Sequence, residues 1–367
     1  MALKGLMAAL AAGSLAAAQP CHAGDEQPAK AAAGDSFSTF TPRPDGRDHR
    51  LDYEAWTEAL AAFVVSMGPP LRKLPPGGFS GSRRYGHNSI YRLDGAMVGF
   101  SVMDDEVIAN IARYRRELEQ VADRVDIQSL PRNEQLAYWF NLHNVALVEK
   151  IAAVWPIYVP RELMVEGVPL DEARFISVEG VALSPRDIRE KIVFRHWKSP
   201  DVIYGFWRGE IGGPAIQRRA FGGADLPNQL KRVAREFANS RRGVERRGST
   251  LHVAELYSEA APFFFPDFEK DLRAHLSDHV EGKVAEMLTE TSLVKATLRE
   301  YDIADLDGGR MTNRYYKGGP LSPALRGLLA QRAEKFDYIE RKMPRTGTVT
   351  FSNIDLPGDP VDKGEIE

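Results

Sequence analysis

The longest stretch of apolar positions at helical spacing lies between residues 130 and 156. Apolar side chains recur there at steps of three and four residues, which predicts a long, largely buried helix. Pro131 suits the first turn of such a helix, where a missing backbone N–H costs little. Pro156 cannot continue a helix, so we expect the helix to end just before it. The apolar positions are Leu136, Trp139, Phe140, Leu142, Val145, Ala146, Val148 and Ile151.

Polar residues interrupt this apolar helix. Glu134 precedes Asn141 by about two helical turns, so Glu134, Asn141 and Asn144 can lie on one stripe. Leaving a buried amide or carboxylate unpaired costs roughly 1–3 kcal/mol, so these groups need partners. Two interpretations stay open. The stripe is either a structural network that ties the helix to neighbouring loops, or it lines a pocket with His143 or Glu134 at its wall.

The rest of the pattern predicts further helices and a few short strands. Residues 104–125 form an amphipathic pattern typical of a surface helix, and residues 173–183 a strand pair that turns at Glu179-Gly180. Ser184-Pro185-Arg186-Asp187 has the order of a capped helix start. Residues 202–207 read as a buried strand, and more helices are expected over 226–237, 267–277, 281–291 and 322–341.

These elements define the expected fold class, which is helix-rich α+β. We predict a single large domain in which a few short strands pack on the central buried helix. The chain has 367 residues, with 43% hydrophobic and 27% charged positions, which are ordinary globular values. The formal net charge of −3 gives no global field that would attract nucleic acid.

The first 23 residues have the pattern of a secretory signal peptide. A basic start is followed by a short apolar run, too short to cross a bilayer, and by a small-residue cleavage pattern that ends at Ala23. The only cysteine, Cys21, would leave with this segment, which excludes disulfides and cysteine catalysis in the mature chain. We therefore expect a periplasmic or secreted bacterial protein without a transmembrane segment; the alternative is a retained helical anchor.

The composition predicts how the remaining chain is divided. Residues 24–48 read as a flexible linker, residues 49–305 as the folded domain, residues 306–343 as a C-terminal helical extension and residues 344–367 as an extended or disordered tail.

Tests for familiar catalytic and metal motifs are negative. The sequence has no phosphate-binding loop, no Gly-x-Ser-x-Gly elbow and no His-Glu-x-x-His motif. His275 and His279 could share a helix face, but two ligands without an evident third make a poor metal site, so a surface pair is expected. We therefore predict no metal and no cofactor. Arg208 and Glu210 follow the predicted buried strand and could form either a structural ion pair or part of a pocket wall.

Residues 133–144, with the sequence Asn-Glu-Gln-Leu-Ala-Tyr-Trp-Phe-Asn-Leu-His-Asn, resemble the signature of the domain of unknown function family 547. Three further stretches agree in order. They are Leu183 to Ile188, the glycine-proline loop and helix from Ser199 to Phe237, and the aromatic stretch Phe263 to Phe268 with the later pair Tyr301-Asp302. The resemblance covers about residues 55–305.

The functional hypothesis rests on the positions at which this sequence differs from the family pattern. The resemblance implies two cysteines and a serine in the loop and a histidine on the short helix, and a Cys–His pair would suit thiol chemistry. By position the cysteines fall on Arg208 and Gly213, the serine on Glu210 and the histidine on Glu190. Arginine is neither a nucleophile nor a proton shuttle near neutral pH, so this divergent chain cannot perform that chemistry.

The resemblance and its departures therefore predict an exported soluble protein. We expect it to be a non-catalytic binding or assembly module on a degenerate enzyme-like scaffold. Arg208 would face a carboxylate or phosphate on an anionic small molecule or an envelope component. The alternative is a hydrolase of an envelope-derived substrate, with Glu134, Glu190 or Glu210 as general base and His143 as its partner. A purely structural envelope protein would have no cleft. The candidate ligand-binding residues are Glu134, Asn141, His143, Asn144, Glu190, Arg208 and Glu210.

Overall fold

The helix predicted around Asn141 is α3 (Arg132–Val154), and all of its residues from Glu134 to Ala152 except Lys150 are buried. The computed structural model describes residues 36–72, 87, 89–310 and 322–342, and the statements below refer to these residues. Pro131 directly precedes α3, and Trp155 ends it ahead of Pro156, which confirms both predicted ends.

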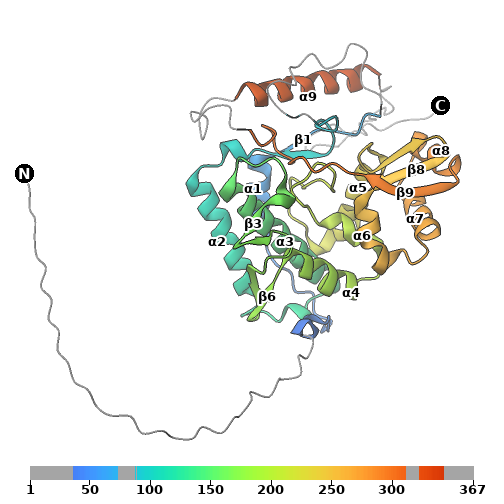
Figure 1. The fold of residues 1–367 in the computed structure, drawn as a ribbon. Coiled ribbons are helices and arrows are strands. Elements are labelled where there is room, and N and C mark those ends of the chain that lie inside the picture. Colours follow the sequence, from blue (N-terminus) through green and yellow to red (C-terminus); the bar gives the residue numbers. More distant parts are fainter. Residues whose placement is uncertain (1–35, 73–86, 88, 311–321, 343–367) are drawn as a thin grey trace, which may run out of the picture. The chain divides into compact units, whose positions relative to one another are not determined.

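Further helices accompany α3. α2 (Asp105–Val121) runs along it (Figure 1). At the start of α2, the carboxylate of Asp104 accepts a hydrogen bond from the backbone N–H of Val107 at 2.8 Å. The remaining helices are α1 (Glu54–Phe63), α4 (Phe194–His196), α5 (Leu226–Asn239), α6 (Glu255–Phe264), α7 (Phe268–Ser277), α8 (Gly282–Thr289) and α9 (Pro323–Lys342).

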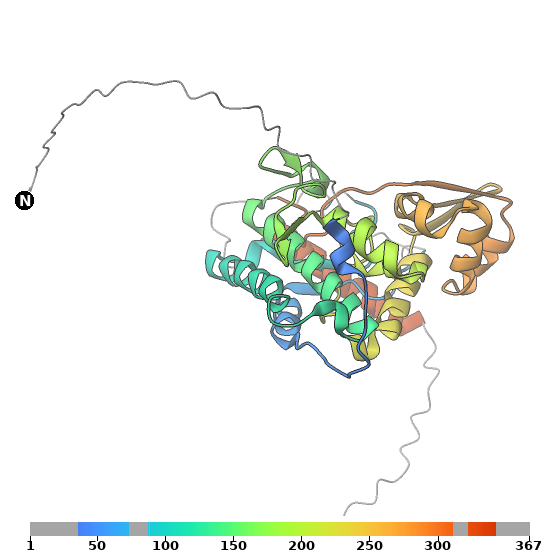
Figure 2. The same cartoon turned by 90° about the horizontal axis from the view of Figure 1, so that it is seen from below.

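The strands are short and form small separate sheets. Three antiparallel pairs join β1 (Val64–Ser66) to β2 (Ala96–Val98), β3 (Met164–Val165) to β4 (Val168–Pro169), and β5 (Ile176–Val178) to β6 (Val181–Leu183). β7 (Val244–Arg247) and β9 (Leu293–Leu298) flank β8 (Thr250–Ala254), antiparallel and parallel to it respectively. Helices α7 and α8 gather near this three-stranded sheet (Figures 1 and 2). The helix-rich α+β class is thereby confirmed.

The predicted turn between β5 and β6 is also present. Glu179 and Gly180 both have positive φ angles, of 51° and 76°, as a tight two-residue hairpin turn requires.

The buried strand predicted over 202–207 is wrong. Residues Pro200–Gly205 form a 3₁₀ helix, η7, instead. Ser199 caps it by accepting a hydrogen bond from the backbone N–H of Asp201 at 3.3 Å, and Pro200 supplies the fixed φ of a first helical position. The segment is apolar because it is buried on all sides, which periodicity alone cannot distinguish from a buried strand.

The hydrophobic core includes residues that precede Leu51 and lie in the predicted linker. Phe37 and Phe40 are buried, and the ring of Phe40 meets Trp139 of α3 edge to face with centroids 5.2 Å apart. The predicted signal peptide, the first part of the predicted linker and the predicted tail lie outside the described residues. Among the residues that are described, no helix combines the length and the apolar character needed to cross a bilayer.

Candidate functional site

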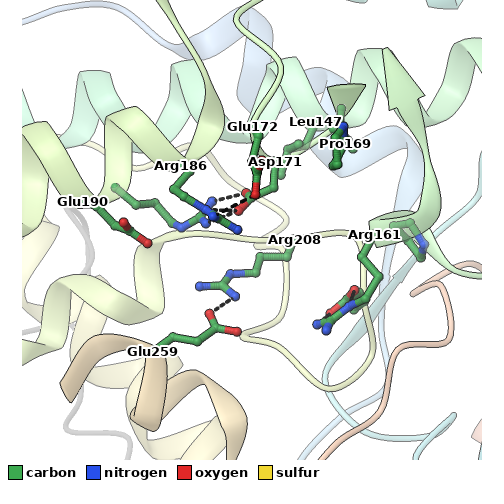
Figure 3. A pocket seen from close by; sticks show the side chains of 13 residues that line it. Leu147, Arg161, Pro169, Asp171, Glu172, Arg186, Glu190, Arg208 and Glu259 are labelled. Carbon is green, nitrogen blue, oxygen red and sulfur yellow. Dashed lines mark hydrogen bonds and ion pairs between the residues drawn. The ribbon is translucent and has the colours of Figure 1, made fainter. Parts of the chain in front are cut away.

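A cavity of about 450 Å³ opens beside the second half of α3. Its lining is dominated by charge, with four arginines and five carboxylates, so the lining carries one net negative charge. Figure 3 shows Arg208 near the centre, with Asp171 and Arg186 on one side and Glu259 on the other. The lining residues are Leu147, Pro160, Arg161, Pro169, Leu170, Asp171, Glu172, Arg186, Arg189, Glu190, Arg208, Glu210 and Glu259.

A capped helical segment supplies one side of the cavity. The hydroxyl of Ser184 accepts a hydrogen bond from the backbone N–H of Asp187 at 3.0 Å, and the carboxylate of Asp187 accepts one from the backbone N–H of Ser184 at 3.1 Å. This reciprocal pair is a capping box and confirms the predicted helix start. The helix then widens into a π-helical stretch, η6 (Asp187–Val193), which carries Arg189 and Glu190. Such stretches are rare and occur frequently at functional sites.

The best-buried ion pair of the lining joins Arg189 to Asp171. Two guanidinium nitrogens of Arg189 donate to the two oxygens of Asp171 at 2.6 and 2.7 Å, and Arg186 adds a third donor at 3.1 Å. Burial by itself would raise the pKa of Asp171, but the charge and hydrogen bonds of Arg189 outweigh it and hold that pKa well below its usual range. Asp171 is therefore a fixed carboxylate anion.

A second bidentate pair joins Glu210 to Arg161, with contacts of 2.6 and 2.7 Å. The guanidinium of Arg161 also lies 3.4 Å from the centroid of the Tyr301 ring. Burial raises the pKa of Glu210, while the Arg161 pair opposes that rise. Both partners are thus oriented before any ligand arrives.

The Arg208–Glu210 pair suggested by their proximity in sequence is wrong. Glu210 pairs with Arg161, and Arg208 donates through Nη1 to Glu259 of α6. Gly209 separates the two side chains and has a φ of +82°, a left-handed conformation that glycine adopts without strain. A Cβ at this position would lie 2.6 Å from the side chain of Ile151, so the close packing against α3 also requires glycine.

Comparison with known protein families identifies this part of the chain. The model of the family described as "Protein of unknown function, DUF547" matches residues 127–238. That part of the chain is similar to the DUF547 family. No curated protein and no solved structure matches the chain. The matched residues run from just before α3 through η6 and η7 to α5, and the expected resemblance is confirmed over them.

Within the DUF547 segment, the two asparagines of α3 bind backbone rather than the cavity. The amide of Asn141 donates to the carbonyl of Phe221 at 2.8 Å and accepts from its N–H at 3.0 Å. Asn144 donates to the carbonyl of Gly205 and accepts from the N–H of Trp207, both at 3.0 Å. The two amides therefore hold the loops on either side of Arg208, and neither lines the cavity.

His143 of the DUF547 segment lies behind the cavity wall. Its Nδ1 is 3.0 Å from the side-chain oxygen of Asn144, and its Nε2 is 3.2 Å from a guanidinium nitrogen of Arg189. Burial, assisted by the positive charge of Arg189, lowers the pKa of His143 to about 3. The ring is therefore neutral near pH 7, accepts from Arg189 at Nε2 and donates to Asn144 at Nδ1.

Glu134, at the start of α3, also lies away from the cavity. Its carboxylate approaches Gly223 so closely that a Cβ there would meet an oxygen of Glu134 at 2.4 Å. Burial raises its pKa, while the backbone groups of Leu51 and Gly223 act in the opposite direction. Of the seven candidate residues, the structure brings Glu190, Arg208 and Glu210 together at the cavity and places Glu134, Asn141, His143 and Asn144 elsewhere.

Six charged residues of the site were not among the candidates from the sequence: Arg161, Asp171, Glu172, Arg186, Arg189 and Glu259. Arg189 directly precedes Glu190, so the DUF547 motif offered a signal there. Arg186 lies in the predicted helix start. The other four stand in segments without a motif and reach the cavity only through the tertiary fold.

Proposed function

We propose that the chain is an exported, non-catalytic binding protein that takes a small charged ligand at the cavity beside α3. Export is supported by the signal-peptide pattern of residues 1–23. Binding is supported by the size of the cavity, since pockets for small molecules span about 300–1,000 Å³. The observation that carries the proposal is the ion pair of Arg208 with Glu259, a partner that is partly exposed.

Among Arg161, Arg189 and Arg208, the last has the most exchangeable partner. Arg189 and Arg161 are each held by two short contacts, and their partners Asp171 and Glu210 are 32% and 7% exposed. Arg208 is 17% exposed, but its partner Glu259 is 38% exposed and is contacted through Nη1 alone. A ligand carboxylate or phosphate could therefore replace Glu259, because Glu259 regains water when it is released.

The charges of the lining narrow the class of ligand. A purely anionic molecule would enter a cavity whose lining carries one net negative charge. Glu172 and Glu190 also line the cavity (Figure 3) and would repel a second anionic group. The ligand should therefore combine a carboxylate or phosphate for Arg208 with an ammonium or hydroxyl group for these carboxylates. Amino acids, short peptides and acidic amino sugars of the bacterial envelope have this chemistry.

The arrangement of His143 favours binding over catalysis. A general base needs a partner within hydrogen-bond reach and access to water. His143 is fully buried, and among the described residues its ring contacts Asn144 and Arg189 rather than a carboxylate. Glu210 is held by two hydrogen bonds to Arg161, and Glu134 is not part of the cavity lining.

One observation favours the alternative, a carboxylate-dependent hydrolase. Within the described residues, Glu190 is the lining carboxylate without an ion pair. It stands where the resemblance places a histidine of the family. In this alternative Glu190 would activate water without help from His143.

A thermal-shift screen with matched variants tests the proposal. The panel contains dicarboxylates, sugar phosphates, amino acids, dipeptides of both chiralities and acidic amino sugars. Arg208→Gln removes the charge at the cavity. Arg241→Gln is the control, because Arg241 pairs with Glu245 at 2.7 Å outside this cavity. The wild-type chain and Arg241→Gln should both be stabilised by a zwitterionic ligand, and Arg208→Gln should not.

If every stabilising ligand acts equally on Arg208→Gln, the proposal is wrong. If a ligand is instead consumed, and Glu190→Gln stops its consumption, the hydrolase alternative replaces it.

A further inference from the structure

A second polar cluster lies outside the cavity, where η7 meets α7. Asp201 stands in the first turn of η7, His275 in the last turn of α7, and His279 just beyond the end of α7. The two histidines are buried, which corrects the surface pair expected from their spacing. The aromatic rings of Tyr204 and Phe265 pack on His275, at centroid distances of 5.7 and 5.5 Å, and this packing takes the pair out of solvent.

The third ligand that the sequence lacked is Asp201. One potential ligand atom from each of the three residues lies within 4.8 Å of the other two. A carboxylate oxygen of Asp201 is 2.8 Å from Nε2 of His279 and 3.9 Å from Nδ1 of His275. Ligands bound at about 2.0–2.1 Å to a tetrahedral zinc ion lie about 3.3 Å from one another. The two separations bracket that value, so small side-chain movements would complete the geometry.

We propose that Asp201, His275 and His279 bind a divalent transition metal ion of the zinc class. Two imidazoles and one carboxylate are ligands that zinc accepts, and three protein ligands leave a fourth position for water. Asp201 is 21% exposed, so the site has an entry path from solvent.

The surroundings of His275 resemble the support that metal-binding histidines receive. Its other ring nitrogen, Nε2, lies 2.9 Å from the hydroxyl of Tyr204, which in turn lies 3.1 Å from the hydroxyl of Tyr257. This chain of hydroxyls fixes the ring so that Nδ1 faces Asp201, as outer partners do at known metal sites.

The ring of His279 has a partner on one side only. Its Nε2 contacts Asp201, while its Nδ1 is buried and has no hydrogen-bond partner among the described residues. Two further charged groups act on this cluster. The negative charge of Asp278 favours a bound cation, and the positive charge of Lys231 opposes one. A bound ion would replace the contact between His279 and Asp201 with coordination bonds from both histidines and Asp201. These bonds would offset the free-energy cost of burying the two imidazole rings.

The ion would act as a structural clamp on the binding loop. η7 leads directly into Trp207 and Arg208, and Asn144 holds the same loop from the side of α3. A metal at Asp201 would fasten the start of η7 to α7. It would stabilise the folded chain without contacting the ligand of the cavity. The metal site therefore does not depend on the proposed function.

Metal titration of the full chain tests the site. The protein is purified with an affinity tag that contains no histidine, stripped with a chelator, and titrated with Co²⁺ and Zn²⁺. The wild-type chain should take up about one equivalent of either ion, and Co²⁺ should give the visible absorption of a four-coordinate site. Zn²⁺ should raise the melting temperature. A wild-type chain that binds neither ion stoichiometrically overturns the proposal, whatever the variants do.

Variants locate the ion. Asp201→Asn and His279→Gln keep similar side-chain volumes and should each weaken Co²⁺ binding more than about tenfold, while Tyr204→Phe should weaken it by about 10- to 100-fold through the lost support of His275. His252→Gln is the matched control, because His252 is a partly exposed histidine on β8 that contacts Thr297. Circular dichroism identifies variants that fail to fold. Binding that survives in folded Asp201→Asn and His279→Gln would place the ion elsewhere and refute this site.

Discussion

The molecule contains two neighbouring polar regions that differ in how their groups are satisfied. The amide region consists of Asn141, His143 and Asn144 on α3, and it is buried and paired largely with backbone. The charged region consists of the arginines and carboxylates that line the cavity, and it is paired side chain to side chain. Backbone partners cannot leave, whereas side-chain partners at an open cavity can be exchanged. The first region therefore sets the shape of the loops, and the second offers groups to a ligand.

The largest effect on stability is expected for Asn144→Ala. The change would leave the carbonyl of Gly205 and the N–H of Trp207 buried without partners, at a cost of about 1–3 kcal/mol for each group. Chemical denaturation should show a loss of more than about 2 kcal/mol in the free energy of unfolding. Asn228→Ala, an exposed asparagine of α5 that contacts Asp225, should change it by less than about 0.5 kcal/mol. Equal losses in the two variants would remove the structural role of Asn144.

A somewhat smaller loss is expected for Gly205→Ala. A Cβ on Gly205 would lie 2.3 Å from the ring of Phe140, so the variant overpacks the contact between η7 and α3, at about 1–3 kcal/mol. Gly222→Ala is the control, since its Cβ would meet nothing within 4 Å and its φ of −133° suits any residue. Denaturation curves that coincide for the two variants would show that the loop yields easily and is not held in place.

The pH dependence of stability distinguishes the neutral histidine from the charged region. His143 stays unprotonated in the folded chain down to about pH 3, but in the unfolded chain it takes up a proton near about pH 6.5. The unfolded state then binds the additional proton, so the free energy of unfolding should fall as the pH drops from about 6.5 towards 3. His143→Gln should show a shallower fall over the same range, whatever its own stability. Parallel pH profiles would mean that His143 is protonated in the folded chain.

The smallest effect on stability is expected for Arg208→Gln. The Arg208–Glu259 pair is partly exposed, and such pairs contribute roughly 0–1 kcal/mol. Chemical denaturation should therefore give nearly the wild-type free energy of unfolding. A loss as large as that of Asn144→Ala would show that Arg208 is part of the structural network and would remove the contrast between the two regions.

The parts of this structure that depend on local pattern could be predicted from the sequence. The ends of α3, the capping box at Ser184 and the turn at Glu179-Gly180 depend on residues within a few positions of one another, and each was predicted. The ion pairs of the cavity could not be predicted, because their partners are far apart in the sequence. Arg161 and Glu259 lie 49 and 51 positions from Glu210 and Arg208, so the lining pairs could not be read from neighbouring residues. The same limit explains η7 and the burial of His275, which depend on packing from distant aromatic rings.

Ligand binding by Arg208 is tested by the ligand-induced change in melting temperature of the wild-type and Arg208→Gln chains. Without ligand, the two melting temperatures should be nearly equal. A zwitterionic carboxylate or phosphate ligand should raise the melting temperature of the wild-type chain and leave that of Arg208→Gln unchanged. A shift of equal size in both chains would show that Arg208 does not bind the ligand.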